Sequence, residues 1–581
     1  MPVPVLARAR KCFVTSLAVP VRPLRTWQRQ ALTAYLRTRP QDYLAVATPG
    51  AGKTTFALRC AAELLADHTV QAITVVTPTE HLKSQWARAA HEVGIALDPA
   101  FRNAQGKASG AFTGVAVTYA QVAAHPVLHR ARTEARRTFV ILDEVHHSGD
   151  ALTWGDAVRE AFGPAVRRLS LTGTPFRSDT NAIPFVSYAP DVDGIIRSAA
   201  DHSYGYADAL RDGVVRPVLF LAYSGEMRWR TSAGEEIAAT LGEPLTVEQT
   251  AHAWRTALDP QGEWIPSVLT AADHRLTQVR GHGMPDAGGL VIASDHLSAR
   301  AYAALLRRIT GVAPVVVLSD EPKASRKIAE FATSEDRWMV AVRMVSEGVD
   351  IPRLAVGVYA TSVSTPLFFA QAVGRFLRVR GSRETASVFV PSVPALLNLA
   401  AEMEVQRDHA LNGPRQDQFL DDAMLRDANR TRDEVGEETS GFEALEASAH
   451  LDRVIYDGAE WGTAAAAGTV EEEEYLGLPG LLDPDQVAVL LHKRQAEQLA
   501  AGRARQRAGG GTKPVELTTA ELLAALRREL NTLVNGHTIR TGRGHADIHA
   551  ELRRACPGPP TAQATAELLR TRIQHLHRSP R

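Results

Sequence analysis

The sequence is poor in cysteine and has no long apolar run. Its three cysteines, Cys12, Cys60 and Cys556, lie far apart and form no C-x-x-C pair. This spacing excludes a disulfide framework and fits the reducing cytoplasm, where we expect the protein. No uninterrupted apolar stretch reaches about 18 residues, so no membrane span is predicted. Pro20 and Pro23 interrupt the apolar N-terminal segment and no cleavage site follows it, so we expect no export signal.

The chain also lacks an excess of charge of either sign. Its 65 basic and 65 acidic residues balance, so no global positive field attracts nucleic acid. Any nucleic acid binding must therefore use local patches. A length of 581 residues exceeds what one hydrophobic core can serve, and roughly three or four domains are expected.

The segment that does carry chemistry is A-T-P-G-A-G-K-T-T at residues 47–55. It matches the phosphate-binding pattern G-x-x-x-x-G-K-[ST], except that alanine stands in place of the first glycine. An apolar run precedes the segment and a helical pattern follows it, which directs a helix N-terminus toward an anion. The residues predicted to bind nucleotide are Pro49, Gly50, Ala51, Gly52, Lys53, Thr54 and Thr55. Lys53 would bring its charge to the β- and γ-phosphates, and the Thr54 hydroxyl would bind Mg²⁺.

Two carboxylates follow another apolar run. Asp143 and Glu144 come directly after residues 139–142, F-V-I-L, and so lie at the carboxyl end of a predicted strand. Ligands of open α/β sheets bind at that edge. Asp143 is predicted to hold Mg²⁺, directly or through water, and Glu144 to orient or deprotonate the attacking water.

Short apolar runs recur between helical patterns in two series. They lie at residues 43–47, 72–77, 114–118, 138–142 and 168–172, and then at 289–293, 314–318, 338–342, 355–360 and 387–390. Strands that are apolar throughout are typical of parallel sheets covered on both faces. The predicted fold class is α/β, with two tandem doubly wound lobes and a mainly helical C-terminal region.

The domain boundaries follow from changes of pattern along the chain. We expect one lobe in residues 1–220 and the second in 289–395, joined by a helical connector without strand rhythm at 221–288. The remainder is expected to form a helical accessory region at 396–500, a basic Gly-rich linker at 501–516 and a small helical module at 517–581.

These motifs, in this order, resemble those of superfamily 2 helicases of the DEAD/DEAH-box type. Within that group the chain resembles the branch of XPB-like helicases and restriction-enzyme motor subunits, over residues 24–391. The resemblance implies RecA-like lobes, hydrolysis of ATP with Mg²⁺, and nucleic acid as partner, with DNA favoured over RNA.

In the first lobe the resemblance adds three segments to the two motifs above. L-R-T-W-Q at 24–28 resembles the Q motif, in which Gln28 would pair with adenine. T-P-T-x-x-L-x-x-Q-W at 77–86 and V-T-Y at 117–119 resemble strand-binding segments, and L-T-G-T-P-F-R at 171–177 resembles motif III. The implied contacts to a nucleic acid strand are Thr77, Pro78, Thr118, Arg177 and, in the second lobe, Thr361.

In the second lobe two segments carry the resemblance. Residues 345–352 resemble motif V, which would bring Gly348 and Asp350 to the nucleotide. Residues 371–378 resemble motif VI, Q-x-x-G-R-x-x-R, which begins at Gln371 and contains Arg375 and Arg378. Two arginines three apart on a helix share one face, so both could reach one γ-phosphate as arginine fingers.

The sequence therefore predicts an ATP-dependent helicase or translocase, with two alternatives left open. One is a translocase that moves on duplex without separating its strands. The other is an ATP-gated module that senses nucleic acid and signals to a protein partner through residues 396–581.

Overall fold

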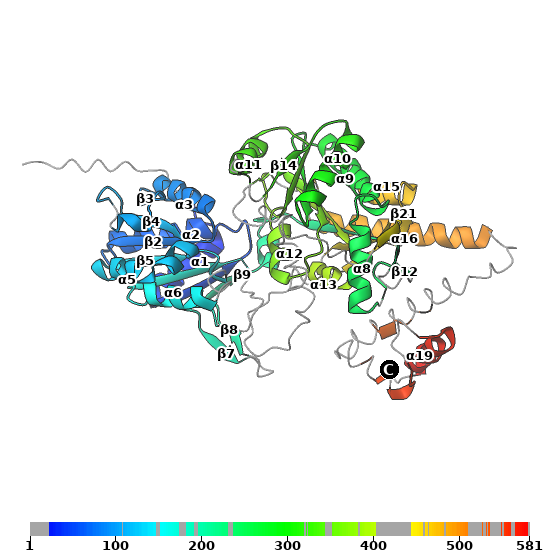
Figure 1. Cartoon of the computed structure of the whole chain (residues 1–581), viewed down its shortest axis with the longest axis horizontal. Coiled ribbons are helices and arrows are strands. Elements are labelled where there is room, and N and C mark those ends of the chain that lie inside the picture. The colour runs from blue at the N-terminus through cyan, green and yellow to red at the C-terminus, as the bar shows by residue number, and fades with distance from the viewer. Residues whose placement is uncertain are drawn as a thin grey trace, which may run out of the picture. The chain divides into compact units, whose positions relative to one another are not determined.

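The chain, seen in a computed structural model, divides by its contacts into two compact units (Figure 1). The first comprises Met1–Ala47, Gly52–Pro175 and Asn181–Tyr204, and the second Thr48–Ala51, Phe176–Thr180 and Gly205–Arg581. The residues that the structure describes are 23–106, 109–146, 152–173, 182–190, 196–230, 236–243, 245–318, 321, 324–342, 351–381, 384–401, 443–456, 459–462, 464–481, 484–508, 526, 530, 533–534, 548, 551–552, 554–558 and 564–578.

A seven-stranded sheet forms the centre of the first unit, in the order β3-β4-β2-β5-β6-β1-β9. All its strand pairs are parallel. The strands are β1 (Asp42–Ala47), β2 (Ala72–Thr77), β3 (Leu97–Asp98), β4 (Gly114–Thr118), β5 (Thr138–Leu142), β6 (Arg167–Thr172) and β9 (His202–Tyr204). Beside this sheet, β7 (Tyr188–Pro190) and β8 (Ile196–Ser198) form an antiparallel pair.

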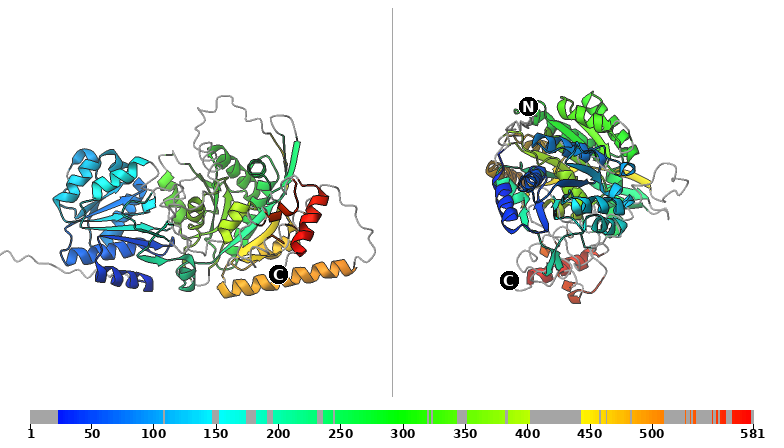
Figure 2. Two further views of the ribbon diagram at one scale, coloured as in Figure 1. Left: turned by 90° about the horizontal axis from the view of Figure 1, so that it is seen from below. Right: turned by 90° about the vertical axis from the view of Figure 1, so that its left-hand side faces the viewer.

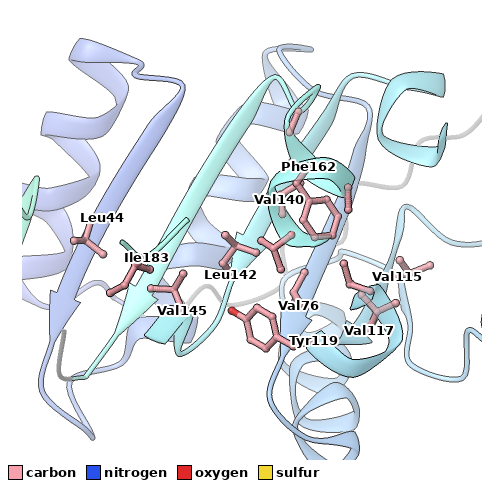
Figure 3. Packing of buried hydrophobic residues seen from close by; sticks show 14 of the residues in the cluster. Leu44, Val76, Val115, Val117, Tyr119, Val140, Leu142, Val145, Phe162 and Ile183 are labelled. Carbon is pink, nitrogen blue, oxygen red and sulfur yellow. The ribbon is translucent and has the colours of Figure 1, made fainter. Parts of the chain in front are cut away.

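Helices cover both faces of this sheet (Figure 2), as its apolar strands require. They are α1 (Thr26–Thr38), α2 (Lys53–Ala66), α3 (Glu80–Glu92), α4 (Tyr119–Ala124), α5 (Pro126–Ala135) and α6 (Leu152–Phe162), with a short 3₁₀ turn at Asn103–Gln105. Under them lies a core of fully buried side chains, among them Val76, Val117, Val140, Leu142 and Phe162 (Figure 3). This packing fixes the strand ends that carry the predicted site.

The second unit contains a nine-stranded sheet in the order β14-β15-β13-β16-β17-β10-β19-β20, with β21 paired to β19. Its strands are β10 (Val218–Ser224), β13 (Gly288–Ala293), β14 (Val315–Val317), β15 (Trp338–Val342), β16 (Leu354–Ala360), β17 (Ala386–Pro391), β19 (His450–Tyr456), β20 (Ala459–Trp461) and β21 (Ala465–Ala466). The pairs from β14 to β10 are parallel, and β19 joins β10 in the antiparallel sense.

A second, three-stranded sheet lies in the same unit, in the order β12-β11-β18. Its strands are β11 (Glu226–Arg230), β12 (Glu236–Thr240) and β18 (Glu443–Ala447). The helices of the unit are α7 (Tyr206–Arg211), α8 (Val247–Ala257), α9 (Trp264–Gly281), α10 (His296–Thr310), α11 (Ala324–Thr333), α12 (Pro366–Val373), α13 (Pro394–Ala401), α15 (Val470–Leu476), α16 (Pro484–Ala508) and α19 (Ala566–Arg578). No helix within the described ranges is both long and apolar enough to cross a membrane.

The α/β class and both series of parallel strands are confirmed, but the boundaries between them differ from expectation. Residues 205–220, expected in the first lobe, belong to the second unit, because β10 pairs with β17. The expected helical connector at 221–288 contains β11 and β12 before α8 and α9. The expected helical region at 396–500 contains four strands, β18 to β21, and α16 continues to Ala508, into the expected linker.

The misplaced strands have a common physical cause. Residues 443–447 read E-A-L-E-A and residues 236–240 read E-I-A-A-T. Alanine, leucine and glutamate favour helices in isolation, so the local preference points away from a strand. Both segments become strands because they pair with the two edges of β11, which supplies the backbone partners.

Arg216 ties together three segments of the second unit from a fully buried position. Its Nε donates to the carbonyl of Phe376 at 2.6 Å, and its Nη1 pairs with Glu384 at 3.1 Å. Its Nη2 donates to the carbonyl of Leu354. Burial lowers the pKa of Arg216 to about 10, although the charge of Glu384 raises it. The guanidinium therefore holds the turn after α12, within the segment that resembles motif VI, against the start of β16.

Arg216→Met is expected to destabilise the second unit by roughly 3–5 kcal/mol, because the buried carbonyls of Phe376 and Leu354 would lose their donor and Glu384 would keep only its pair with Arg380. The variant keeps an apolar side chain of similar length, so the loss reports pairing more than volume. Urea unfolding followed by circular dichroism measures it. Arg228→Ala, which removes only exposed ion pairs to Glu236 and Glu446, is the control and should leave the midpoint unchanged. Equal midpoints for both variants would contradict this role.

Candidate nucleotide-binding site

The phosphate-binding segment folds as the turn between β1 and α2. Gly50 and Gly52 have φ angles of +82° and +91°, in the left-handed region that favours glycine. A Cβ on Gly52 would also come within 2.7 Å of Gln28 Nε2. Ala47 is the buried last residue of β1 and has no positive φ, so the fold needs no glycine there. The departure from the usual pattern at this position is therefore conservative.

Lys53 is the first residue of α2, and its ammonium group lies between two acceptors. Nζ donates to the carbonyl of Ala47 at 3.2 Å and pairs with Glu144 Oε1 at 3.0 Å. The structure thus brings together the lysine and the glutamate that the sequence predicts for one site. A phosphate bound by the turn would replace or share these contacts of the lysine.

Glu144 follows β5 in a conformation that is uncommon for a residue with a side chain. Its φ is +48°, and its Oε2 accepts a hydrogen bond from the backbone N–H of Gly173 at 3.1 Å. His146 Nδ1 lies 3.7 Å from the same oxygen and 2.9 Å from Thr172 Oγ1. The carboxylate is therefore held by the lysine on one side and by the end of β6 on the other.

Asp143 is buried beside it, with two aromatic donors. Its Oδ2 accepts from Trp86 Nε1 at 2.7 Å, and its carbonyl oxygen accepts from the Tyr119 hydroxyl at 3.0 Å. Its own N–H donates to the carbonyl of Val76 at 2.9 Å. Sequence reasoning did not predict these roles of Trp86 and Tyr119, although both residues stand in segments that it had singled out.

The two neighbouring carboxyl groups have opposite pKa shifts. Burial and the charge of Glu144 raise the pKa of Asp143 to about 6. Burial also opposes ionisation of Glu144, but the Lys53 ammonium, His146 and the hydrogen bond from Gly173 lower its pKa to about 2. Both carboxyl groups are thus mainly ionised at neutral pH, and Asp143 lies much nearer to its pKa than Glu144 does.

The two residues predicted to hold Mg²⁺, Thr54 and Asp143, carry donor atoms of the kind that suits this ion. Mg²⁺ prefers oxygen ligands and is usually bound by one or two protein groups together with substrate phosphates. Thr54 and Asp143 supply a hydroxyl and a carboxylate, and a cation would favour the ionised form of Asp143. Within the described part of the chain, no group of three or more His, Cys, Asp or Glu residues could hold a metal by itself.

Gln28 lies against the same turn. Its Oε1 accepts from the backbone N–H of Arg25 at 2.8 Å, and its Nε2 donates to the carbonyl of Gly52 at 2.9 Å. Next to it, Trp27 stacks on Tyr204 with ring centroids 5.2 Å apart. The structure therefore joins the segment resembling the Q motif to the phosphate-binding turn, while pairing of Gln28 with adenine remains a prediction.

The predicted strand contacts Thr77, Thr118 and Thr361 are all buried. Thr77 Oγ1 donates to the carbonyl of Thr79 at 3.1 Å, and Thr118 Oγ1 caps α4 by accepting from Gln121 N at 3.1 Å. These hydroxyls serve the fold, and the N–H of Thr118 also donates to Gln121 Oε1 at 2.9 Å, so contact of Thr77 and Thr118 with a nucleic acid strand remains a prediction. Pro78 is partly exposed beside Thr77. Arg177, Gly348 and Asp350 lie outside the described residues.

The shared helix face predicted for Arg375 and Arg378 is wrong. α12 carries Gln371 but ends at Val373, and the N–H of Phe376 donates to the carbonyl of Val373 in a turn. Arg378 then forms an isolated antiparallel bridge with Val215. The chain leaves the helix here because Phe376 and Leu377 are drawn into the core, where each is at most 2% exposed. A role of both arginines at the γ-phosphate remains a prediction.

The sequence comparisons identify both a domain and close relatives. Residues 22–177 match the family model "Type III restriction enzyme, res subunit". Over 558 residues, 95% of this chain and 92% of the relative, the chain is 61% identical to the uncharacterized protein MT2985 of Mycobacterium tuberculosis strain CDC 1551 / Oshkosh. It is 59% identical over 555 residues to the uncharacterized protein ML1624 of Mycobacterium leprae, covering 95% and 93% of the two chains.

Solved structures similar to the chain include a restriction-modification enzyme and a yeast protein bound to RNA. One is the ATP-dependent type ISP restriction-modification enzyme LlaBIII bound to DNA, with 12% identity and a TM-score of 0.43 over 96% of this chain and 40% of that one. The chain therefore spans less than half of LlaBIII. Another is S. cerevisiae Dbp5 bound to RNA and ADP BeF3, with 14% identity and a TM-score of 0.43 over 71% and 95%.

Proposed function

The chain belongs to the same family as these mycobacterial proteins and to the superfamily 2 helicases. From this premise we propose that it is an ATP-dependent helicase or translocase that acts on nucleic acid. The observation that supports this most directly is the grouping of Lys53, Glu144 and Asp143 at the turn after β1. Lys53 and Glu144 are 3.0 Å apart and Asp143 precedes Glu144 at the end of β5. ATP is the proposed substrate, DNA the favoured partner, and the cytoplasm the proposed compartment.

Each residue of this group has a proposed task in hydrolysis. The turn from Pro49 to Thr55 would bind the phosphates, and Lys53 would neutralise charge on the β- and γ-phosphates. Glu144 would accept a proton from, or orient, the attacking water. Mg²⁺, held by Thr54 and Asp143, would supply charge neutralisation at the phosphate oxygens. The family resemblance adds four further residues to this proposed site. Gly348 and Asp350 would approach the nucleotide, and Arg375 and Arg378 would act at the γ-phosphate.

Glu144→Gln is expected to lower ATP turnover by about 10²–10⁴-fold while ATP binding persists, because the amide cannot accept a proton. The variant keeps nearly the same shape and still accepts from Gly173 N. Phosphate release gives turnover, and a fluorescent ATP analogue gives binding. Glu63→Gln on α2, which alters only a partly exposed pair with Arg59, is the matched control. Turnover of Glu144→Gln within threefold of wild type would contradict the assignment.

The choice between motor and alternatives needs an assay of movement. Strand separation from a tailed duplex would identify a helicase, whereas displacement of the third strand from a triplex without duplex opening would identify a duplex translocase. Slow ATP turnover without strand separation or third-strand displacement, together with a protein partner that binds residues 396–581, would favour the ATP-gated sensing module. DNA, RNA and hybrid substrates are compared at one stated salt concentration, because such affinities depend strongly on salt.

A further inference from the structure

Two buried aromatic side chains reach Asp143 from the two segments predicted to contact nucleic acid in the first unit. Trp86 belongs to α3, which begins two residues after Pro78, and Tyr119 is the first residue of α4, directly after Thr118. Each ends in one hydrogen bond to Asp143. The residue proposed to hold Mg²⁺ is therefore linked to both predicted strand-binding segments.

The bond from Trp86 is short and directed at the functional group itself. The indole Nε1 lies 2.7 Å from Asp143 Oδ2, and Trp86 is 2% exposed. An indole N–H can only donate, and a hydrogen bond to a carboxylate is stronger than one between neutral groups. The Trp86 side chain rotates about only two torsions and its indole ring is rigid. A displacement of α3 would therefore move the indole N–H and, with it, the Asp143 carboxylate.

The bond from Tyr119 fixes the backbone of the same residue. The hydroxyl donates to the Asp143 carbonyl at 3.0 Å, and the ring is fully buried in the core next to Leu142 and Val117 (Figure 3). Asp143 is thus held at its carboxylate by α3 and at its backbone by α4. Densely packed interiors transmit such displacements instead of absorbing them.

A buried lysine joins the two helices. Lys83 of α3 is 3% exposed, and its Nζ donates to Gln121 Oε1 of α4 at 3.0 Å. The same Gln121 oxygen accepts from the N–H of Thr118 at 2.9 Å, and its Nε2 donates to the carbonyl of Phe101 at 3.1 Å. α3 and the start of α4 are therefore connected to each other as well as to Asp143.

We propose that Trp86 and Tyr119 are positioning residues through which strand binding at α3 and α4 controls the placement of Asp143, and thereby the affinity for Mg²⁺·ATP. The proposal rests on the proposed function and names the route by which nucleic acid regulates that site. Neither side chain touches substrate in this scheme; both act through Asp143. By thermodynamic linkage, nucleotide must then change strand affinity by the same factor as strand changes nucleotide affinity.

The test measures this coupling factor by binding alone. The dissociation constant of a fluorescent single strand, or of a duplex, is measured for the full chain with and without Mg²⁺ and a non-hydrolysable ATP analogue. Wild type is expected to show a factor of about 5–150 between the two conditions. In Tyr119→Phe, which loses only the hydroxyl, and in Trp86→Phe, which replaces the indole by a smaller ring without a donor, the factor should fall to within about threefold of unity. Trp264→Phe, which removes a buried indole bond to the carbonyl of Ser224, is the matched control and should keep the wild-type factor.

Each outcome decides a different point. A wild-type factor that survives in both Trp86→Phe and Tyr119→Phe overturns the route through Asp143 and leaves the proposed function intact. No strand binding by wild type, or a factor of one, contradicts the proposed function and this proposal together. Tyr119→Phe loses one hydroxyl, so it keeps the test valid if Trp86→Phe does not fold, which thermal melting would show.

Discussion

Replacing Lys53 with alanine is expected to lower ATP turnover by about 10³-fold, while the protein still binds nucleic acid. The ammonium group pairs with Glu144 at 3.0 Å and lies at the turn whose glycines adopt positive φ angles. Its loss removes the point charge that would neutralise the β- and γ-phosphates during hydrolysis. Steady-state phosphate release with saturating nucleic acid measures the effect.

The control for this variant lies on the same helix. Arg59→Ala removes an i,i+4 pair with Glu63 at the surface of α2, so it changes charge by the same amount without touching the turn. It should retain wild-type turnover. Unimpaired hydrolysis by Lys53→Ala, with Arg59→Ala as reference, would show that the turn is not the nucleotide site.

The second large effect is expected from the arginines that resemble motif VI. Arg375→Ala and Arg378→Ala should each lower turnover by about 10³–10⁵-fold, the range seen when an arginine that stabilises charge on a transferring phosphoryl group is lost. The apparent affinity for ATP should change far less, because such an arginine acts mainly in the transition state. Single-turnover hydrolysis beside equilibrium binding of an ATP analogue separates the two quantities.

Lysine substitutions sharpen this second prediction. A lysine keeps the positive charge but lacks the planar fork of a guanidinium group, so Arg375→Lys and Arg378→Lys should stay well below wild type. Arg307→Ala, an exposed arginine of α10 in the same unit, serves as the control with unchanged turnover. If either alanine variant hydrolyses ATP at the wild-type rate, that arginine has no part in catalysis.

Much of the first unit could be predicted from the sequence because its signals are local. Most interior strands are nearly all apolar, and the glycines, Lys53 and the Asp143–Glu144 pair stand at fixed distances from strand ends. Because parallel strands end at the same edge of a sheet, the residues that follow β1 and β5 come together there. The sequence alone could not show that alanine is tolerated at position 47 of the phosphate-binding segment. Motif spacing does not reveal the φ angle of the backbone, and only the structure shows that this angle is not positive.

The rest depends on partners far away in the sequence. E-A-L-E-A at 443–447 becomes a strand because β11 lies more than 200 residues earlier in the chain, and no local pattern announces that pairing. Arg375 and Arg378 lie beyond the end of α12 because the chain turns to bury Phe376 in the core. The hydrogen bonds from Trp86 and Tyr119 to Asp143 form where the neighbouring strands β4, β2 and β5 end. Predicting these bonds therefore requires the strand order of the sheet as well as the motifs.

Under the proposed function, nucleic acid stimulates ATP hydrolysis at the site that contains Lys53 and Glu144. The direct measurement is the phosphate release rate of the full chain with Mg²⁺·ATP, as a function of added DNA or RNA, beside Glu144→Gln. We expect the rate to rise to saturation with at least one nucleic acid, and we expect no such rise in Glu144→Gln or without Mg²⁺. A rate that no nucleic acid changes, or that Glu144→Gln shares, would contradict it.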